Sequence, residues 1–263
     1  MLPPGATGRR SKGPPVTTLL SCQSLTRRFG GLTAVNDVTL GFERGEVHAV
    51  IGTNGAGKST LINMLSGEMP ASSGRIHLKG HDITGWSQPR RALAGVGRSY
   101  QRTTVFPSFS VFENCRLCAQ AAHPRPLAFW ESAAHCKTSG DIASQALKAV
   151  GLSHLAAQPA GSLSHGGKRQ LEIAMCLATQ PEVLLLDEPL AGMGAEETDR
   201  MLQVLQGLKA GHAIVLVEHD MDAVFRIAER ITVMVNGEVI ASASPRAIRN
   251  NREVQVAYLG EHG

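Results

Sequence analysis

The most informative segment of this chain is Gly52-Thr53-Asn54-Gly55-Ala56-Gly57-Lys58-Ser59. It matches the pattern G-x-x-x-x-G-K-[ST] in full, a glycine-rich loop whose backbone N–H groups curl around phosphate oxygens. Glycines are needed because side chains would block that approach, and the next helix points its positive dipole end at the same anion. Lys58 suits the β- and γ-phosphates, and the Ser59 hydroxyl can ligate Mg²⁺. The phosphate-binding residues that we expect are Gly52, Thr53, Asn54, Gly55, Ala56, Gly57, Lys58, Ser59 and Thr60.

The residues on both sides of this loop fit a strand before it and a helix after it. Residues 46–51 are expected to form a strand that ends at this loop. After the loop, Leu61, Met64 and Leu65 recur at i, i+3 and i+4, which is the spacing of one helical face, and Gly67 stops the pattern. This strand–loop–helix context is the one that a phosphate-binding loop requires.

Apolar runs and helical patterns alternate along the rest of the chain. Residues 183–186 and 213–217 are continuous apolar runs, typical of parallel strands that are buried on both faces. Helical spacing and turn signals add further elements: helices at 168–179, 201–208 and 221–228, the last with Asp220 as its N-cap, and a hairpin at 231–240 around Asn236-Gly237. The order predicts an α/β fold, into which a mostly helical segment is inserted between about residues 105 and 160.

Two carboxylates follow the buried strand Val183-Leu184-Leu185-Leu186 directly. Open α/β sheets bind ligands at the carboxyl ends of their strands, so Asp187 and Glu188 stand where a ligand is expected. Asp187 suits the shell of Mg²⁺, and Glu188 suits polarisation of an attacking water. The loop and this strand end predict a nucleotide hydrolase or kinase, and the guanine-reading pattern Asn-Lys-x-Asp of GTPases does not occur in the chain.

The segment Leu163-Ser164-His165-Gly166-Gly167 narrows the class. It lies before an amphipathic helix, with Ser164 23 residues before Asp187. Here the chain resembles the ATP-binding subunits of ABC transporters, whose signature at this position is L-S-G-G-Q, and Ser164 and Gly166 match it. The resemblance covers nearly everything from Thr17 to the end. It implies an ABC-type nucleotide-binding cassette over 17–263, with a helical subdomain insertion and a small antiparallel β part.

The resemblance also assigns roles to single residues. Gln101, within Ser99-Tyr100-Gln101-Arg102, looks like the glutamine that senses Mg²⁺ and water. His219, after the last core strand, looks like the histidine beside the γ-phosphate, and Phe29 looks like the aromatic residue that stacks on adenine. The implied sets are Glu188, His219 and Gln101 for catalysis, Ser59, Gln101 and Asp187 for Mg²⁺, and Phe29, Ser164 and Gly166 beside the phosphate loop for ATP.

Three positions depart from the general family pattern. His165 and Gly167 replace signature residues, and Gly194 stands where the loop after Glu188 often ends in Asp. The cross-subunit contact of that Asp is therefore in doubt. The loop resembles the branch of branched-chain amino-acid importers, as do residues 29–35 and the closing residues 257–261. The ATPases of urea and short-chain amide importers are close relatives of that branch.

The resemblance implies partners as well. One chain holds one phosphate-binding loop, so a second cassette, a hetero- or homodimer partner, must come from another chain. Two ATP molecules would lie between them, each held by Lys58 of one cassette and by Ser164 of the other. Integral-membrane permeases, and indirectly a periplasmic solute-binding protein, complete the expected importer. The expected location is the cytoplasm, on the inner face of the plasma membrane.

Residues 104–112 contain three of the chain's seven Phe, at Phe106, Phe109 and Phe112. One interpretation is a docking groove for the permease beside Gln101, and the other is a local core of the helical insertion. Both remain open at this stage. We assign no role to Arg90, Arg91 and Arg98, which we interpret as surface solvation or family structure.

Other functions fit the motifs less well. A DNA-repair ABC ATPase needs long coiled coils, and a translation-type one carries two cassettes in one chain; this chain has neither, so nucleic acid is not an expected partner. A non-hydrolysing cassette is disfavoured because Lys58, Asp187, Glu188 and His219 are all present. An exporter subunit remains as an alternative, although exporter chains commonly carry a fused membrane domain.

Composition sets the remaining bounds. The apolar runs are far shorter than the roughly 20 residues of a spanning helix, and the N-terminus lacks the apolar core of a secretory signal. Of the net charge of +4, Arg9, Arg10 and Lys12 contribute +3 within residues 1–16, which have four Pro and read as a disordered tail. The five cysteines are scattered and fit a reducing compartment. Cys115 and Cys118 form a C-x-x-C without a second ligand pair, which disfavours zinc.

Overall fold

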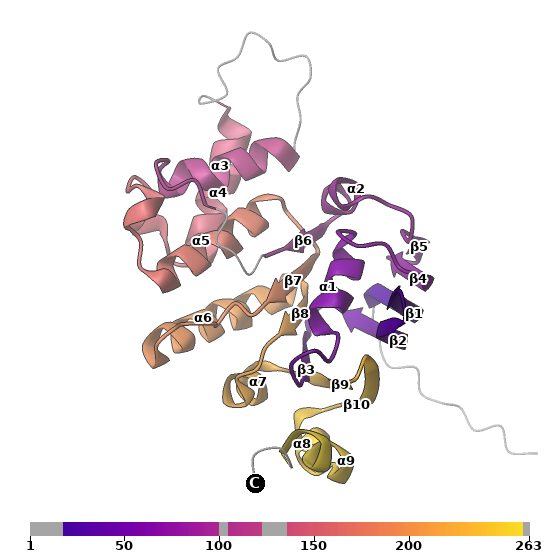
Figure 1. Ribbon diagram of the computed structural model, residues 1–263. Coiled ribbons are helices and arrows are strands. Elements are labelled where there is room, and N and C mark those ends of the chain that lie inside the picture. The colour runs from indigo at the N-terminus through magenta and orange to yellow at the C-terminus, as the bar shows by residue number, and fades with distance from the viewer. Residues whose placement is uncertain (1–17, 100–104, 123–135, 260–263) are drawn as a thin grey trace, which may run out of the picture.

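The computed structural model describes residues 18–99, 105–122 and 136–259, and the side chains up to residue 257 (Figure 1). Gln101 and the basic tail 1–16 lie outside the described residues. Two sheets and several groups of helices make up this part of the chain.

A six-stranded sheet forms the centre of the fold and carries the phosphate loop. Its strand order is β10-β9-β3-β8-β7-β6, in which β10 alone runs antiparallel to its neighbour and the other pairs are parallel. The strands span Val47–Gly52 (β3), Val96–Arg98 (β6), Val183–Asp187 (β7), Ala213–Val217 (β8), Arg230–Val235 (β9) and Glu238–Ala243 (β10). The carboxyl ends of the parallel strands therefore meet at one edge, where the loop after β3 lies beside the ends of β7 and β8.

Side chains of the central strands are buried on both faces. Along β7, Val183 and Leu185 pack into one core, whereas Leu184 and Leu186 pack into another. This alternation explains the continuous apolar runs in the sequence, because each face of the strand needs its own apolar residues.

The second sheet is antiparallel, in the order β2-β1-β4-β5, and lies to the right in Figure 1. Its strands are Thr18–Phe29 (β1), Leu32–Glu43 (β2), Ser73–Leu78 (β4) and His81–Asp82 (β5). Helix α1 (Lys58–Ser66) packs its apolar face into the core that this sheet shares with the central sheet, through Leu61, Ile62, Met64 and Leu65. Gly67 ends α1 in a left-handed conformation, at φ 84°, as the glycine predicts.

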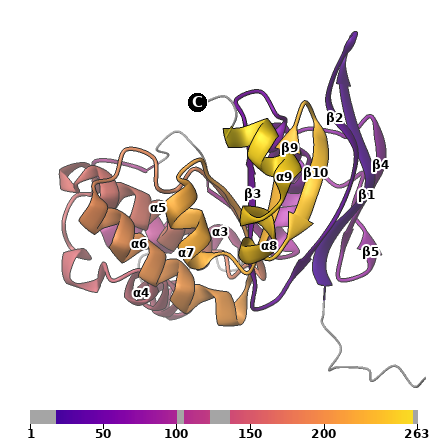
Figure 2. The same ribbon diagram turned by 90° about the horizontal axis from the view of Figure 1, so that it is seen from below.

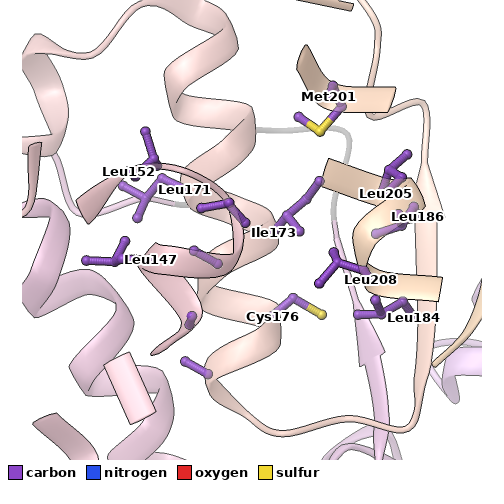
Figure 3. Packing of buried hydrophobic residues seen from close by; sticks show 14 of the residues in the cluster. Leu147, Leu152, Leu171, Ile173, Cys176, Leu184, Leu186, Met201, Leu205 and Leu208 are labelled. Carbon is purple, nitrogen blue, oxygen red and sulfur yellow. The ribbon is translucent and has the colours of Figure 1, made fainter. Parts of the chain in front are cut away.

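Helices cover the other face of the central sheet. The core there joins β7 and β8 to α3 (Val111–Ala122), α4 (Lys137–Ala149), α5 (His165–Ala178) and α6 (Ala195–Leu208). Figure 3 shows Leu171, Ile173 and Cys176 of α5 between two groups of labelled residues. On one side lie Leu147 of α4 and Leu152 just after that helix, and on the other lie the labelled residues of β7 and α6. Helix α5 begins three residues before the predicted start at 168, because Ser164 caps it.

The C-terminal helices lie beside β9 and β10, at one edge of the central sheet. Helix α7 (Met221–Ile227) starts at Asp220, whose side chain accepts from the N–H of Ala223, and α8 (Pro245–Arg249) and α9 (Arg252–Val254) follow the hairpin. Figure 2 shows α8 and α9 against β9 and β10, with the antiparallel sheet beyond them. The remaining short elements are α2 (Gln88–Leu93), three 3-10 turns (Ser153–Leu155, Ala160–Ser162 and Lys209–Gly211) and a π-helical turn (Gln255–Leu259). Among the described residues, no helix combines the length and the apolar character that crossing a membrane requires.

Candidate active site

The phosphate loop is held by close backbone contacts that only glycine permits. A Cβ on Gly52 would lie 2.1 Å from the carbonyl oxygen of Met234, and one on Gly57 would lie 2.3 Å from that of Ala34. Gly57 has φ 96° and is the N-cap of α1, and no side chain caps this helix end. The first N–H groups of α1 therefore remain available to an anion, as the sequence motif predicts.

Lys58 lies folded over its own loop. Its ammonium donates to the carbonyl oxygens of Gly52 at 2.7 Å and Thr53 at 2.9 Å, and the side chain is buried. Burial lowers the pKa of Lys58, while the charges of Glu188 and Asp187 oppose that shift. Two neutral carbonyl groups are weak partners for a cation, so a polyphosphate would compete well for it.

One cavity joins the loop to the acidic strand end. It has a volume of about 200 Å³ and is lined by Ala34, Glu188 and the loop residues Asn54, Gly55, Ala56, Gly57, Lys58, Ser59 and Thr60. Seven of the nine predicted phosphate-binding residues thus share a wall with Glu188, although 130 positions separate it from Lys58 in the chain. Gly52 and Thr53 contribute the carbonyl groups that hold Lys58 instead.

Asp187 ends β7 deep in the structure, with 3% of its surface exposed. Its Oδ2 lies 3.8 Å from the guanidinium of Arg98, and its buried Oδ1 has no hydrogen-bond partner among the described residues. Burial raises the pKa of Asp187, and the positive charge of Arg98 opposes that rise. An unpartnered buried carboxylate oxygen beside a phosphate loop fits the oxygen donor set that Mg²⁺ prefers.

Glu188 adopts a left-handed backbone conformation, with φ 51°. Such a conformation is uncommon outside glycine and is found where the surrounding structure fixes it, often at functional sites. Here the N–H of Glu188 donates to the carbonyl of Val217 in the next strand at 2.9 Å. The turn brings the Glu188 side chain to the cavity above the loop.

His219 follows β8 and lies close to two carboxylates. Its Nδ1 is 4.0 Å from Oε1 of Glu188 and 3.8 Å from Oε2 of Glu218, and the ring is largely exposed. The structure thus brings Glu188 and His219 together, as expected.

Glu218 also belongs to this site, although the sequence motifs did not indicate it. It is 1% exposed, and its carboxylate accepts from the N–H groups of Leu190 at 2.8 Å and His219 at 3.2 Å. Burial raises the pKa of Glu218 despite these bonds. The residue ties the loop after Glu188 to the backbone of His219. The sequence pattern that could have pointed to Glu218 is its position directly after the apolar run 213–217.

For Arg91 and Arg98, the structure rules out surface solvation and leaves the other interpretation, a structural role. Arg91 is 2% exposed and donates to the carbonyl oxygens of Met64 and Leu65 at the end of α1. The side chain of Arg98 is 9% exposed and contacts Asn63, Ser66 and Glu68 besides Asp187. Both guanidinium groups are buried because carbonyl and carboxylate oxygens surround them. Arg90 does remain exposed, stacked on Trp86.

Phe29 ends β1 and is 42% exposed. The guanidinium of Arg27 lies 4.6 Å from the centre of its ring, a cation–π arrangement. An exposed ring of this kind can stack on a base, but Phe29 is not among the residues that line the cavity above the loop.

Ser164 and Gly166 lie at the start of α5. Ser164 is the N-cap, and its hydroxyl accepts from the N–H of Gly167 at 3.1 Å. Both residues line a small cavity of about 50 Å³ that shares no residue with the cavity above the phosphate loop. Within one chain, the signature and the loop therefore belong to separate sites.

The departures from the family pattern have local roles. Nε2 of His165 lies 3.1 Å from the carbonyl oxygen of Ala191, so the signature contacts the loop after Glu188. Gly194 is the N-cap of α6 and offers no side chain to its N–H groups. Gly167 supplies the N–H that Ser164 accepts.

The cysteines do not form a metal site in the described part of the chain. No group of three or more His, Cys, Asp or Glu side chains there could hold an ion. Cys115 and Cys118 are instead packed into or against the helical core, and burial raises the pKa of Cys118 to about 11. At that pKa the thiol is protonated at neutral pH and unreactive.

Known proteins are similar to this chain over most of its length. Residues 35–191 match the family model of the ABC transporter, and residues 238–263 match that of the branched-chain amino acid ATP-binding cassette transporter. The high-affinity branched-chain amino acid transport ATP-binding protein BraF of Pseudomonas aeruginosa is 38% identical over 254 residues, which cover 92% of this chain and 98% of BraF. LivG of Escherichia coli K12, of the same description, is 39% identical over 251 residues, which cover 92% of this chain and 98% of LivG.

Solved structures are similar too. A nucleotide-free ATP-binding cassette from an ABC transporter superposes with a TM-score of 0.82 at 28% identity, covering 92% of this chain and 98% of that one. The chain belongs to the ABC transporter family and is an ABC-type ATPase. Within that family, its relatives and its C-terminal match fall in the branched-chain amino acid branch, which confirms the resemblance drawn from the motifs.

Proposed function

We propose that this protein is the ATP-hydrolysing subunit of an importer that takes up branched-chain or related amino acids. The observation that carries the proposal is the single cavity shared by the phosphate loop and Glu188, in a chain whose relatives are named for branched-chain amino acid transport. As part of the proposal, residues 17–263 form the cassette, with a helical insertion at about 105–160 and a basic tail at 1–16.

The phosphate side of the site binds ATP through the start of α1. Backbone N–H groups of the loop and the freed ammonium of Lys58 would hold the β- and γ-phosphates. Ser59 and the unpartnered Oδ1 of Asp187, with Gln101, would hold Mg²⁺, which neutralises phosphate charge when bound. Phe29 would stack on the adenine.

Hydrolysis requires a base close to the γ-phosphate. Glu188 would orient a water molecule and take its proton as the water oxygen attacks the γ-phosphorus and the bond to the ADP oxygen breaks. His219 lies 4.0 Å from Glu188 and would hold it in position. The left-handed turn at Glu188 supports this role, because it fixes the carboxylate at the loop cavity.

A second cassette completes the site. Because Ser164 and Gly166 line a cavity separate from that of Lys58, ATP bound to the loop would meet the signature of a partner chain. Closing and opening of this pair would drive the permeases and, through them, release from a periplasmic solute-binding protein.

The permease would dock on the helical side of the molecule. Phe106 and Phe109 are 51% and 44% exposed, and their ring centres are 5.5 Å apart. Phe112 packs against the helical core instead. The two interpretations of the Phe-rich segment therefore apply to different residues: an exposed pair suited to docking and one core residue.

Two substitutions test the ATPase site. Lys58→Ala removes the one side-chain cation that the described residues contribute to the cavity wall, and it is expected to weaken ATP binding at least tenfold in calorimetry. Glu188→Gln keeps the shape of the base but loses its proton acceptor, so ATP binding should persist while turnover falls by about 10² or more.

Glu196→Gln is the matched control, because this carboxylate is 94% exposed and outside the site. It should hydrolyse ATP at the normal rate. Unchanged ATP affinity in Lys58→Ala would refute the phosphate-loop assignment, and normal turnover in Glu188→Gln would refute the base.

A further inference from the structure

The signature serine is already engaged within its own chain. Its hydroxyl donates to Oε1 of Glu197 at 3.1 Å while accepting from the N–H of Gly167. A serine hydroxyl has one proton to donate. Ser164 can therefore donate to a phosphate oxygen only after its bond to Glu197 breaks.

The Glu197 carboxylate also covers the glycine of the signature. A Cβ on Gly166 would lie 2.6 Å from the carboxylate carbon and from Oε1, and 2.9 Å from Oε2. Both carboxylate oxygens thus pack directly on the backbone of Gly166, in the first turn of α5. Glu197 lines the same small cavity as Ser164 and Gly166.

The electrostatics of the helix ends favour this position. The first turn of α5 contains no acidic residue of its own, so Glu197 supplies the negative charge that a helix N-terminus attracts. Glu197 is itself in the first turn of α6, together with Glu196. If the Glu197 carboxylate moved away from α5, it would remain at the N-terminus of α6. That helix end would still stabilise its charge, which lowers the free-energy cost of breaking the contact with Ser164.

We infer that Glu197 is a further residue of the ATP site, one that positions Ser164 and competes with the γ-phosphate of the partner-bound ATP for the signature. The inference rests on the proposed function, because only a nucleotide held between two cassettes presents a γ-phosphate to Ser164. ADP lacks that phosphate and would leave Glu197 in place. Glu197 thereby raises the ATP concentration at which the pair closes and favours its opening after hydrolysis.

The test compares Glu197→Ala and Glu197→Gln with Glu196→Gln in the assembled transporter, with its second cassette and permeases in lipid vesicles. Glu196 is the matched control: it carries the same charge in the same helical turn, but its side chain is 94% exposed and it has no bond to the signature. The ATP concentration at half-maximal hydrolysis is measured for each variant, together with the melting temperature.

Removal of the competing carboxylate should lower the half-saturating ATP concentration about threefold in Glu197→Ala, the size of a partly exposed polar contact, and less in Glu197→Gln. ATP affinity of the isolated full chain, which reports the Lys58 side alone, should match the wild type. Glu196→Gln should behave as the wild type in both measurements.

An unchanged or raised half-saturating concentration in both Glu197 variants would overturn the inference, as would a shift of equal size in Glu196→Gln. Ser164→Ala separates this failure from failure of the proposed function. If Ser164→Ala hydrolyses ATP with wild-type parameters, the signature has no role between cassettes. If Ser164→Ala is impaired and the Glu197 variants are not shifted, only the role of Glu197 is refuted.

Discussion

His48 shows how a single buried residue makes stability depend on pH. It lies in β3, 1% exposed, with Nε2 2.7 Å from Oγ1 of Thr232. Burial lowers the pKa of His48 from 6.5 to about 4, the positive charge of Arg230 adds to the shift, and a contact with the backbone of Gly41 opposes it only in part. The folded protein thus keeps this ring neutral where the unfolded chain would protonate it.

The sign of the effect follows from proton binding. Between pH 6.5 and about 4 the unfolded state binds more protons at His48, so the stabilisation present above pH 6.5 is lost as the pH falls. We expect urea unfolding to show a loss of up to about 3 kcal/mol from pH 7 to pH 4.5, and a smaller loss in His48→Gln. His154→Gln, at an exposed histidine, is the control, and its free energy of unfolding should fall with pH as steeply as that of the wild type. An equal dependence of the free energy of unfolding on pH in all three proteins would contradict the role of His48.

Arg98 and Asp187 form a second pair of single residues whose contact affects stability. The guanidinium lies 3.8 Å from Oδ2 of a carboxylate that is almost fully buried. Removing one member of a buried pair leaves the other charge uncompensated, so Arg98→Met should destabilise the fold by about 3 kcal/mol. Adding Asp187→Asn should restore part of that loss, with a coupling energy of about 1 kcal/mol or more in chemical denaturation. Strictly additive effects would mean that the two side chains do not interact.

At the scale of elements, the contact between β6 and α5 depends on Gly97. A Cβ on this residue would lie 2.6 Å from Sγ of Cys176 and 2.9 Å from Cβ of Pro181. Gly97→Ala should therefore overpack this contact and lower the free energy of unfolding by about 1–3 kcal/mol. Adding Cys176→Ala, which removes the sulfur, should recover part of the loss in thermal denaturation.

The control for this prediction is Gly207→Ala in α6, where a new Cβ would meet nothing within 4 Å in the described residues apart from its chain neighbours and the backbone of its own helix. Alanine is the better helix former, so this variant should gain about 0.5 kcal/mol or more. A Gly97→Ala protein as stable as Gly207→Ala would show that β6 and α5 can move apart without cost.

The elements also show what local patterns could predict. The strand and helix around the phosphate loop, the buried strands β7 and β8, and the hairpin of β9 and β10 all followed from apolar period and turn residues. The burial of Arg91 and Arg98 did not, because their partners are backbone and side-chain groups at the end of α1, about 30 positions earlier in the chain. No local pattern encodes such contacts.

At the scale of the whole molecule, the exposed pair Phe106 and Phe109 gives a prediction about assembly. Phe106→Ser with Phe109→Ser should remove two apolar anchors and weaken co-purification with the permeases at least tenfold, while ATP affinity of the isolated chain stays normal. Val256→Ser is the control, because Val256 is 68% exposed but lies in the C-terminal turn. Wild-type recovery of both permeases with the double variant would place the docking surface elsewhere.

The amino-acid sequence was enough to identify the class of site. The spacing of the glycines, Lys58 and Ser59 encodes a phosphate loop, because backbone shape within eight residues is a local property. The sequence also indicated Asp187 and Glu188, because a buried strand must end at the ligand edge of the sheet. Which residues meet at this edge became visible from the folded chain alone. Strand order brings Glu188 to the loop and separates the signature from it, and the first turns of α5 and α6 meet where Glu197 accepts from Ser164. These contacts join distant segments, so they depend on how whole elements pack and on no local pattern.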